Sequence, residues 1–565
     1  MTARYSVGLW MVLVVLASIA ASASAAEPSW PWMWMYAPCN FQVNERADEF
    51  IALMQRSRKA GYNAMLTSDT KFGRLTDRPK NYFANLERVR QAADACGMEL
   101  IPCVMHVGYS NNVLQNNPNL AEGIPVRDCR MIVQGGKATV ADAANLLPGG
   151  GFDEIAGKTF AGWDWADKCV SRDTAVKHGG AASAKMEKFG GENGRIVRKL
   201  AVQPWRQYRM DVWIKTQDIS KPGDIRVAIL APDGRSMNFT DLGVKATQDW
   251  MEHHVLFNSL GNTSVNFYMG TWSGREGTLW LDDASVREVA GVNLLRRDGC
   301  PLKVTSDDGA TVYAEGRDFV RWEYPKMGRV PYAGEYEVVH PEPPLVLPPG
   351  SKIRDGERLR VSFFHTVVIG GGQVCGCLRS EELFGLMEEE VRGLRKYWAP
   401  KTYFMSHDEL RVAGWCDLCT AGGKTAGQVL AENAKRCTAI IRKVEPQARI
   451  FVWSDMFDPH HNAHDKYYLV AGTLEGSWEG LDPSVNIAAW YFGKRNESLA
   501  FFTGRGHKVL IAGYYDTSDL KANVDGWREA AAKVKGVEGF MYTTWQHKYK
   551  DVEEFARLVG EPPRP

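Results

Sequence analysis

The sequence has almost no net charge and few long apolar runs. Its 68 lysines and arginines are balanced by 67 aspartates and glutamates in 565 residues. Such a balance creates no large field of one sign, which argues against nucleic acid or an anionic membrane as the partner. After residue 26, no segment is apolar enough to span a bilayer. With 45% hydrophobic residues, the chain is globular and a neutral partner is the simpler expectation.

Cysteine is also too scarce to frame the fold. The chain has 11 cysteines, an odd number, and Cys416 and Cys419 form the only CxxC pair. One such pair supplies two ligands, whereas structural zinc needs four. A local disulfide or two buried thiols is therefore the favoured interpretation, with zinc as the alternative.

The first residues have the pattern of an export signal. Arg4 precedes an apolar run over 7–20, and the small residues of 21–26 suit cleavage near Ala25 or Ala26. We expect residues 1–26 to be a signal peptide, which implies a secreted or periplasmic protein. A retained membrane anchor is the alternative, but the run is short for a bilayer span.

Strand and helix patterns alternate at both ends of the chain. The first part predicts strands at 32–37, 64–67 and 99–106, with helices at 44–59 and 81–96 between them. After Gly370-Gly371-Gly372 the alternation returns. It begins with a helix at 380–397, and strands follow at 402–406, 450–453, 485–490, 509–514 and 539–543.

The middle of the chain has a different character. Short alternating segments separated by Gly and Asn fill 145–289 and indicate a β-sandwich. A second β-like stretch over 291–366 contains the Pro-rich piece 340–344, which argues against a helix.

Three strands before this region and five after it suggest an α/β fold: a TIM (β/α)8 barrel interrupted after the third strand by a jelly-roll-like β-sandwich and a small β domain. The expected domains after the signal peptide are 27–144 (first barrel part), 145–290 (sandwich), 291–370 (small β domain) and 371–565 (second, catalytic barrel part).

An acidic pair ends the fourth predicted barrel strand. His407-Asp408-Glu409 follows the strand at 402–406, and active sites of such barrels lie at the carboxyl ends of their strands. Two adjacent carboxyl groups in one pocket can be driven to different protonation states, as acid catalysis requires. The alternative is an acid pair at a helix N-terminus.

Aromatic residues end four further strands. Trp453, Trp490 and Trp545 follow the fifth, sixth and eighth strands, and Tyr514-Tyr515-Asp516 follows the seventh. A single tryptophan is more often a core residue. Three at strand ends could wall a sugar-sized pocket.

The order strand-Asp-Glu, strand-Trp, strand-Trp, strand-Tyr-x-Asp and strand-Thr-Trp resembles the catalytic half of glycoside hydrolase family 20, the β-N-acetylhexosaminidases. The resemblance covers about the last 170 residues. It implies that Glu409 is the acid/base, and that Asp408 and Tyr514 hold the 2-acetamido group of the substrate as internal nucleophile. The remaining positions carried over are the pocket tryptophans Trp453, Trp490 and Trp545 and a hydroxyl contact, Asp516.

The chain also departs from that family. Tyr36-Ala37-Pro38-Cys39-Asn40 lacks the arginine that usually follows the first strand, and His106 ends the third strand without the usual Pro-Gly-His. A diverged sister family, such as glycoside hydrolase family 123 with its β-sandwich and galactosamine-type sugars, fits equally well. We include His106, His407 and Asp455 among the candidate substrate-binding residues.

The predicted sandwich carries a second resemblance. Its opening segment, 145–154, and its closing segment, Trp280-Leu281-Asp282-Asp283-Ala284-Ser285-Val286, resemble those of carbohydrate-binding modules of families 4 and 9. The resemblance implies that these motifs could hold a structural calcium ion and that aromatic residues of one face contact sugar. A purely structural sandwich is the alternative. The candidate aromatic residues are Trp163, Trp165, Trp205 and Trp272.

Potential metal ligands are dense after the fifth strand. This cluster comprises Asp455, Asp458, His460, His461, His464 and Asp465. No standard zinc motif fits their spacing, and a sugar-binding loop needs the same side chains. We therefore predict no catalytic metal and no cofactor apart from the calcium.

These observations predict an exported glycoside hydrolase that cleaves β-linked N-acetylhexosamine from a polysaccharide or glycoconjugate. Glu409 would protonate the leaving oxygen while Asp408 aligns the acetamide, with retention of configuration. Two other functions stay open. The protein could be a glycosidase that uses an enzymic carboxylate as nucleophile, or a noncatalytic glycan-binding protein.

Overall fold

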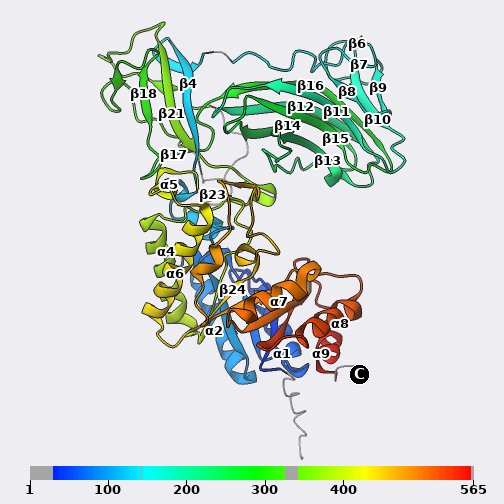
Figure 1. The fold of residues 1–565 in the computed structure, drawn as a ribbon, viewed down its shortest axis with the longest axis vertical. Helices are drawn as coiled ribbons and strands as arrows, with labels where there is room; N and C mark the ends of the chain where they lie inside the picture. Colours follow the sequence, from blue (N-terminus) through cyan, green and yellow to red (C-terminus); the bar gives the residue numbers. More distant parts are fainter. Residues whose placement is uncertain (1–29, 142, 325–326, 328–341, 562–565) are drawn as a thin grey trace, which may run out of the picture.

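The computed structural model describes residues 30–141, 143–324, 327 and 342–561. A parallel barrel surrounded by helices forms one end of the molecule, and two β modules form the other (Figure 1). The predicted signal peptide, 1–26, lies outside the described residues. Within the described ranges no helix is both long and apolar enough to cross a membrane.

Eight parallel strands close the barrel. In order around it they are β1 (Trp32–Tyr36), β2 (Ala64–Thr67), β3 (Glu99–Val104), β22 (Thr402–Met405), β24 (Arg449–Trp453), β26 (Val485–Ala489), β27 (Val509–Tyr514) and β28 (Val537–Thr543).

Side chains alternate between the inside of the barrel and its helix-covered outside, as the strand pleat requires. Trp32, Trp34 and Tyr36 belong to the inner cluster, whereas Met33 and Met35 pack outward. This inner cluster is dominated by large residues, so the barrel is filled at its centre. A cavity opens at its carboxyl end.

The helices around the barrel are α1 (Asn44–Lys59), α2 (Lys80–Cys96), α4 (Glu381–Trp398), α6 (Ala426–Val444), α7 (Arg495–Gly504), α8 (Leu520–Ala531) and α9 (Val552–Gly560). Local capping fixes where two of them begin. The Ser380 side chain accepts the backbone N–H of Leu383 in α4, and Thr425 and Gln428 form a capping box at the start of α6.

The prediction of a TIM (β/α)8 barrel is wrong. Helix and strand do not alternate throughout, since the connection from β24 to β26 contains the 3-10 turns η5 (Asp455–Phe457) and η6 (Ser477–Gly480) and the short β25 (Leu469–Val470), but no α-helix. Only 26% of the described residues are helical, and antiparallel sheets hold most of the remaining strands. The physical reason is local: the 454–484 segment is rich in Gly, Pro, Asp and Asn, which favour turns over helices.

The turn η6 occupies the place of the missing helix by packing directly on α6. A Cβ atom at Gly480 would lie 2.4 Å from the backbone oxygen of Ala431, and one at Gly427 would lie 2.3 Å from that of Glu475. Both contacts are too close for any other residue. Two glycines therefore allow backbone to pack on backbone here.

The inserted region is nested. After β3 the chain passes α3 (Asn111–Leu114) and η2 (Pro118–Leu120) and enters a small antiparallel sheet before it forms the sandwich. The strands of this small sheet are β4 (Ile124–Gln134), β5 (Lys137–Val140), β17 (Leu294–Leu295), β18 (Lys303–Ser306), β19 (Val312–Tyr313), β20 (Leu345–Val346) and β21 (Arg358–His365).

Strands from both sides of the sandwich thus share the small sheet, because β21 pairs with β4. The sequence placed 27–144 in the barrel, whereas β4 and β5 of that range belong to the small sheet. The sandwich is consequently an insertion within an insertion. Residues 340–341 of the Pro-rich piece lie outside the described residues.

Two antiparallel sheets face each other in the sandwich. One contains β14 (Gln248–Asn258), β12 (Gln207–Gln217), β16 (Thr278–Val289), β10 (Ser183–Glu187) and β9 (Val170–Asp173), and the other contains β13 (Ile225–Leu230), β15 (Ser264–Thr271), β11 (Gly194–Ala201) and β8 (Trp165–Ala166). Short hairpin strands β6 (Ile155–Ala156) and β7 (Thr159–Phe160) precede them.

The sandwich contacts the barrel loops through aromatic rings and a backbone hydrogen bond. The ring of Trp205 meets that of Trp415 edge to face at 5.8 Å between centroids, and the ring of Phe239 lies 4.4 Å from that of Tyr468. The backbone N–H of Gly370 also donates to the carbonyl of Phe239 over 2.8 Å. The sandwich is therefore held against the face of the barrel that carries the carboxyl ends of the strands.

Candidate active site

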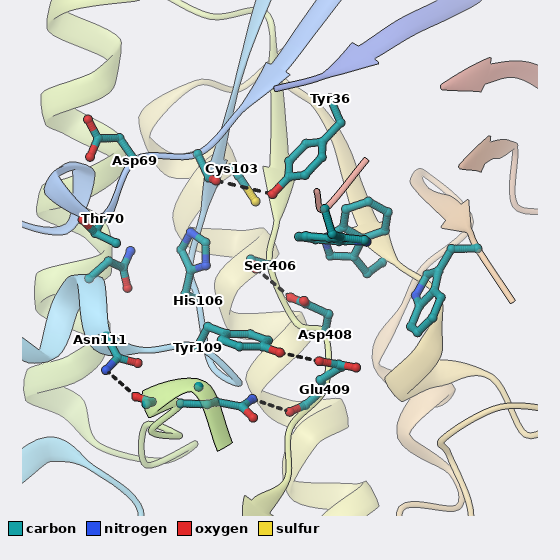
Figure 2. Close-up of a pocket in the computed structure, with 18 of the residues that line it drawn as sticks. Tyr36, Asp69, Thr70, Cys103, His106, Tyr109, Asn111, Ser406, Asp408 and Glu409 are labelled. Carbon is teal, nitrogen blue, oxygen red and sulfur yellow. Dashed lines mark hydrogen bonds between the residues drawn. The ribbon is translucent and has the colours of Figure 1, made fainter. Parts of the chain in front are cut away.

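A cavity of about 800 Å³ opens at the carboxyl ends of the barrel strands. Its floor is the inner core of the barrel, and its walls come from the segments that follow the strands (Figure 2). Acidic side chains after β22 form one wall, aromatic side chains form another, and polar side chains after β2 and β3 form a third. A space of this size accommodates a sugar unit with its neighbours.

Asp408 lies in the acidic wall and is buried. Its carboxylate accepts the hydroxyl of Ser406 over 2.7 Å. Burial is the main reason why its pKa rises to about 6, and the nearby Glu409 raises it further, while the Ser406 bond opposes the rise. Asp408 thus changes its charge within two pH units of neutrality.

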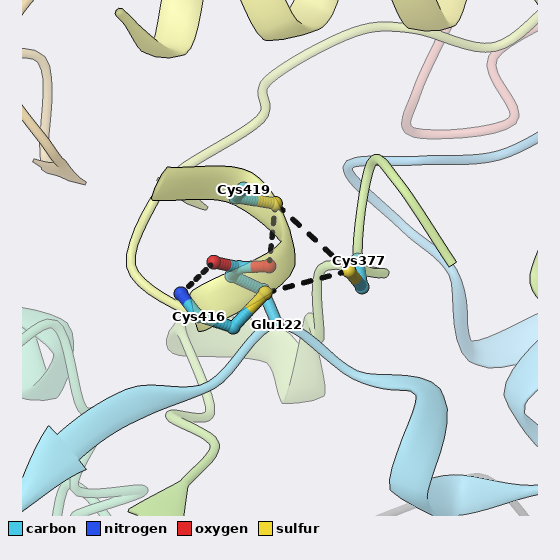
Figure 3. Close-up of side chains that lie close together, drawn as sticks. All are labelled: Glu122, Cys377, Cys416 and Cys419. Atoms are coloured by element: carbon cyan, nitrogen blue, oxygen red, sulfur yellow. Dashed lines mark hydrogen bonds between the residues drawn. The ribbon is translucent and has the colours of Figure 1, made fainter. Parts of the chain in front are cut away.

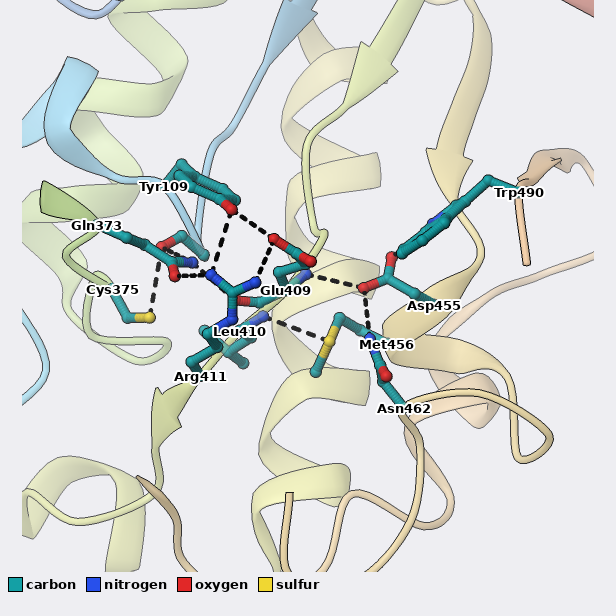
Figure 4. Close-up of polar contacts among 11 residues, drawn as sticks. Tyr109, Gln373, Cys375, Glu409, Leu410, Arg411, Asp455, Met456, Asn462 and Trp490 are labelled. Carbon is teal, nitrogen blue, oxygen red and sulfur yellow. Dashed lines mark hydrogen bonds and ion pairs between the residues drawn. The ribbon is translucent and has the colours of Figure 1, made fainter. Parts of the chain in front are cut away.

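Glu409 stands next to it and is held from several sides (Figure 4). Its Oε2 accepts the hydroxyl of Tyr109 and pairs with the Arg411 guanidinium at 2.7 Å. Arg411 in turn donates to the side-chain oxygen of Gln373, whose amide donates to the Glu409 carbonyl over 2.8 Å. The backbone of Glu409 has a positive φ of 45°, which is uncommon outside glycine and is retained only where contacts enforce it.

Asp455, in the turn η5 that follows β24, anchors this arrangement. It is fully buried, and its Oδ2 accepts the backbone N–H of Glu409 over 2.8 Å and the side-chain amide of Asn462 over 3.0 Å. Burial and the charge of Asp408 raise the pKa of Asp455 to about 8. Asp455 does not line the cavity, so it holds Glu409 in position instead of contacting a ligand.

The three predicted tryptophans do line the cavity. Trp453, Trp490 and Trp545 come from the ends of β24, β26 and β28. Trp453 is buried and lies 6.2 Å from Trp545, which is 44% exposed. Tyr36, which sequence reasoning missed, completes this wall at 5.1 Å from Trp545. The feature of the sequence that could have identified Tyr36 as a cavity residue is its position at the end of β1.

The structure places Tyr515, not Tyr514, in the cavity wall. The ring of Tyr515 stacks on Trp490 at 5.1 Å with an angle of 4° between the rings. Tyr514 instead stacks on Tyr542 at 4.4 Å on the helix-covered side. Tyr514, Tyr515 and Asp516 all have positive φ angles, 69°, 50° and 58°, which interrupt the alternation of the strand. The resemblance to family 20 could not reveal this interruption.

Asp516 also differs from its expected place. Its carboxylate accepts the Thr544 hydroxyl over 2.6 Å and the backbone N–H groups of Trp545 and Gln546 over 2.7 and 3.3 Å. It does not line the cavity. Its role is to tie the end of β27 to the segment after β28, and so to orient Trp545.

Of the two predicted substrate-binding histidines, one lines the cavity and the other does not. His106 lines the cavity, and burial lowers its pKa to about 4, which makes it a neutral hydrogen-bonding group. His407 points away from the cavity and its Nε2 meets the side-chain oxygen of Asn433 at 3.0 Å. The strand pleat explains this: Phe404, Ser406 and Asp408 face inward, so His407 faces α6.

The polar wall contains groups that the sequence did not single out. Asp69 follows β2, pairs with Lys71 at 3.0 Å and accepts the backbone N–H of Phe41 over 3.0 Å. Asn111 and Asn112 follow β3. Carboxylate and amide groups of this kind bind sugar hydroxyls, and their position after strands of the barrel was the available signal.

The histidine-rich cluster does not converge on a metal. His461 stacks on Tyr491 at 4.3 Å and meets the edge of Trp490 at 4.4 Å. Two groups of residues in the described part of the chain come close enough to share an ion, and neither includes His460, His461 or His464. Asp458 and Asp465 do not belong to these groups either.

The four tryptophans proposed for the sandwich lie in different surroundings. Trp163 is a core residue, and Trp205 packs between Trp415 and Arg127. Trp165 is 40% exposed, and the Arg195 guanidinium lies over its ring and over that of Trp272 at 5.5 and 5.9 Å. Trp165 and Trp272 are thus the two that a glycan could reach.

The acidic residues of the opening and closing sandwich segments meet at one loop. Asp153 accepts the backbone N–H groups of Ala181 and Ala182, and Asp282 accepts those of His178 and Gly179. These bonds use Oδ1 of Asp153 and Oδ2 of Asp282. Calcium stays a prediction of the resemblance alone.

No family model matches the chain, and no curated protein matches it. Solved structures similar to parts of it include a rhamnosidase from Novosphingobium sp. PP1Y, at 9% identity and a TM-score of 0.34 over 94% of this chain and 58% of that one. A family 16 carbohydrate-binding module is 21% identical over 22% of this chain and 89% of the module, with a TM-score of 0.17. A xylan-binding domain from Paenibacillus barcinonensis is 16% identical over 26% of this chain and 96% of that one, with a TM-score of 0.20.

The chain thus spans somewhat more than half the length of the rhamnosidase. Likenesses at these scores carry no argument about activity, and the chemistry of the site has to be argued from its own residues.

Proposed function

We propose that the protein is a glycoside hydrolase that removes β-linked N-acetylhexosamine with the acetamide of the substrate as nucleophile. The observation that carries the proposal is the Asp408–Glu409 pair in the cavity opposite an aromatic wall. The wall offers faces on which a pyranose ring packs, and the pair offers two carboxyl groups in unequal surroundings.

The unequal burial of Asp408 and Glu409 supports different catalytic roles for the two residues. Asp408 is buried, whereas the Glu409 side chain is 27% exposed. A proton donor has to reach the glycosidic oxygen on the open side of the sugar, which suits Glu409. A group that orients the acetamide lies deeper, which suits Asp408, and it acts when ionised, above its pKa of about 6.

The reaction proceeds in two steps. Glu409 gives its proton to the glycosidic oxygen while the acetamide oxygen attacks the anomeric carbon, so the bond to the aglycone breaks and an oxazolinium ion forms. Asp408 accepts the acetamide N–H and stabilises its positive charge. Glu409 then takes a proton from water, which opens the oxazolinium ion with net retention. For the first step, the ion pair between Glu409 and Arg411 has to open when the glycosidic oxygen approaches.

The other acidic groups near the cavity are poor candidates for an enzymic nucleophile. Asp455 and Asp516 do not line the cavity, and Asp69 pairs with Lys71. This favours an internal nucleophile over the alternative glycosidase mechanism. Tyr515 replaces Tyr514 as the candidate partner of the acetamide.

Export and polymer binding are further parts of the proposal. The apolar N-terminal run supports secretion or a periplasmic location. The exposed Trp165 and the half-buried Trp272 support binding of a polysaccharide or glycoconjugate by the sandwich.

The test compares matched aryl glycosides that carry a 2-acetamido or a 2-hydroxy group. We expect turnover of the 2-acetamido substrate alone, and inhibition by a thiazoline that mimics the intermediate. Asp408→Asn should lower kcat far more than it raises KM, because the charge-assisted bond strengthens as the acetamide becomes positive. It should also remove an acidic limb of kcat/KM near pH 6.

Equal wild-type rates on the two substrates would contradict the internal nucleophile. Glycan binding without turnover of any glycoside would contradict the hydrolase.

A further inference from the structure

Three thiols and one carboxylate meet where the inserted region joins the barrel (Figure 3). Glu122 lies just before β4, where the chain leaves the barrel, and Cys377 lies just before α4, where it returns. Cys416 immediately precedes the short helix α5 (Asp417–Thr420), which follows β22, and Cys419 lies within this helix. All four are buried, and their ligand atoms lie within 4.8 Å of one another.

The separations fit a tetrahedral metal site. Sγ of Cys377 lies 3.6 Å from Sγ of Cys416 and 3.9 Å from that of Cys419, and Sγ of Cys419 lies 3.6 Å from Oε2 of Glu122. Thiolates bound to one zinc ion at ~2.3 Å in a tetrahedron are about 3.8 Å apart. A disulfide bond would require about 2.05 Å.

The surroundings orient the carboxylate toward the thiols. Oε1 of Glu122 accepts the backbone N–H groups of Trp415 and Cys416 over 2.7 and 3.1 Å, which turns Oε2 to Cys419. The Arg297 guanidinium donates to the carbonyl of Ala121, the residue before Glu122. Ligands held by a second layer of hydrogen bonds are typical of metal sites.

Charge supports the same conclusion. A buried carboxylate among three thiols, without a cation, is costly. A dication with three thiolates and one carboxylate leaves a net charge of minus two, which the nearby Arg297 partly offsets. Soft thiolate ligands select zinc over calcium or magnesium, and an iron–sulfur cluster usually takes four cysteines.

We propose that Glu122, Cys377, Cys416 and Cys419 bind one structural Zn²⁺ ion. Four protein ligands close the coordination sphere and none of them lines the cavity, so the ion has no open position for catalysis. The sequence showed only the CxxC half of the site. The other two ligands, Cys377 and Glu122, lie 39 and 294 positions before Cys416 in the sequence.

The proposed ion would join three segments at one point. It connects both ends of the 123–376 insertion to the loop after β22 that also carries Asp408 and Glu409. Trp415, beside Cys416, packs on Trp205 of the sandwich. Closing so long a loop with a metal restricts the unfolded chain and fixes the sandwich against the barrel.

The experiment measures metal in the protein purified without added metal or chelator. We expect one zinc ion per chain by mass spectrometry, and its release when a mercurial reagent modifies the thiols. Cys377→Ser and Cys419→Ser should lose the zinc, whereas Cys375→Ala, a buried cysteine two residues from Cys377, should retain it.

Substitution of wild-type protein with Co²⁺ gives a readout that does not depend on whether these variants fold. We expect a thiolate-to-cobalt charge-transfer band and the strong visible bands of a tetrahedral ion. Where Cys419→Ser folds, even excess Co²⁺ should restore no more than about two thirds of the wild-type charge-transfer band, since one of three thiolates is lost.

A protein that takes up neither zinc nor cobalt with its thiols reduced would overturn the proposal. So would a disulfide between Cys377 and Cys416 or Cys419 in freshly isolated protein, found by peptide mapping.

Discussion

At the scale of single residues, three carboxyl groups share one small volume. Glu409 contacts Asp455 through its backbone N–H and lies beside Asp408, and burial raises the pKa of both aspartates. Arg411 supplies the positive charge on the opposite side of Glu409. The site therefore keeps protons near neutral pH that isolated aspartates would have lost.

Glu409→Gln removes the proposed proton donor and leaves the shape of the side chain almost unchanged. Turnover should fall by ~10²–10⁴-fold on aryl glycosides with poor leaving groups, and much less on dinitrophenyl glycosides, whose leaving group needs no proton. Exposed Glu389→Gln on α4 is the matched control and should keep wild-type rates. A loss that does not depend on the leaving group would exclude Glu409 as the acid.

Asp455→Asn should change the pH dependence of stability. The folded pKa of Asp455 is about 8 and the unfolded value about 3.9, so the native state binds more protons between these values and the free energy of unfolding falls as pH rises. Asp455→Asn has no ionisable group at this position, so its free energy of unfolding should not fall in this way. At pH 8.5 its melting temperature should exceed that of the wild type by a few degrees, with no such gain at pH 4.

Thermal unfolding at both pH values measures the difference, and exposed Asp355→Asn is the control. Parallel pH profiles of wild type and Asp455→Asn would contradict the prediction.

At the scale of elements, the end of β27 decides which tyrosine reaches the cavity. Three consecutive residues with positive φ turn the ring of Tyr514 outward and that of Tyr515 inward. Such a conformation costs energy in residues other than glycine. The surrounding contacts offset this cost, among them the bond from the Tyr514 N–H to the side chain of Asn523 in α8.

Tyr515→Phe should therefore lower kcat on the 2-acetamido substrate, and Tyr514→Phe should not. A neutral hydrogen bond contributes about 0.5–1.5 kcal/mol, so the loss for Tyr515→Phe should be roughly 2- to 12-fold. Steady-state kinetics of the two variants side by side provide the measurement. The reverse order of effects would restore Tyr514 to the site.

At the scale of the whole molecule, the sandwich reaches the acidic residues through a chain of contacts. Phe239 packs on Tyr468, the Arg411 guanidinium lies 5.0 Å from the Tyr468 ring, and Arg411 pairs with Glu409. The nested insertion is therefore in contact with the candidate active site. It supports the wall of the cavity that holds the proposed acid.

Phe239→Ala should lower turnover even of small aryl substrates that never touch the sandwich. An aromatic pair contributes about 0.5–1.5 kcal/mol, which corresponds to roughly 2- to 12-fold in rate if the contact positions Arg411. Trp165→Ala, on the outer part of the sandwich, should leave those rates unchanged and weaken adsorption to polysaccharide. Unchanged kinetics in Phe239→Ala would separate the sandwich from the chemistry.

The sequence by itself determined the features that depend on short-range order. The eight barrel strands lie at the predicted apolar runs, since burial on both faces leaves a continuous signal. Asp408, Glu409 and the three tryptophans line one cavity because parallel strands of a closed barrel end at the same rim. Side chains of a strand alternate in direction, so the inward orientation of Ser406 and Asp408 could also have excluded His407 from the predicted substrate-binding residues.

Only the tertiary structure decided the rest. The positive φ angles after Gly513 and the pairing of β4 with β21 depend on packing between distant segments. The same holds for Tyr109 on Glu409 and for Glu122 beside three cysteines. Local patterns report the period of an element, whereas these contacts join residues up to hundreds of positions apart, whose proximity is set by how the whole chain buries its apolar surface.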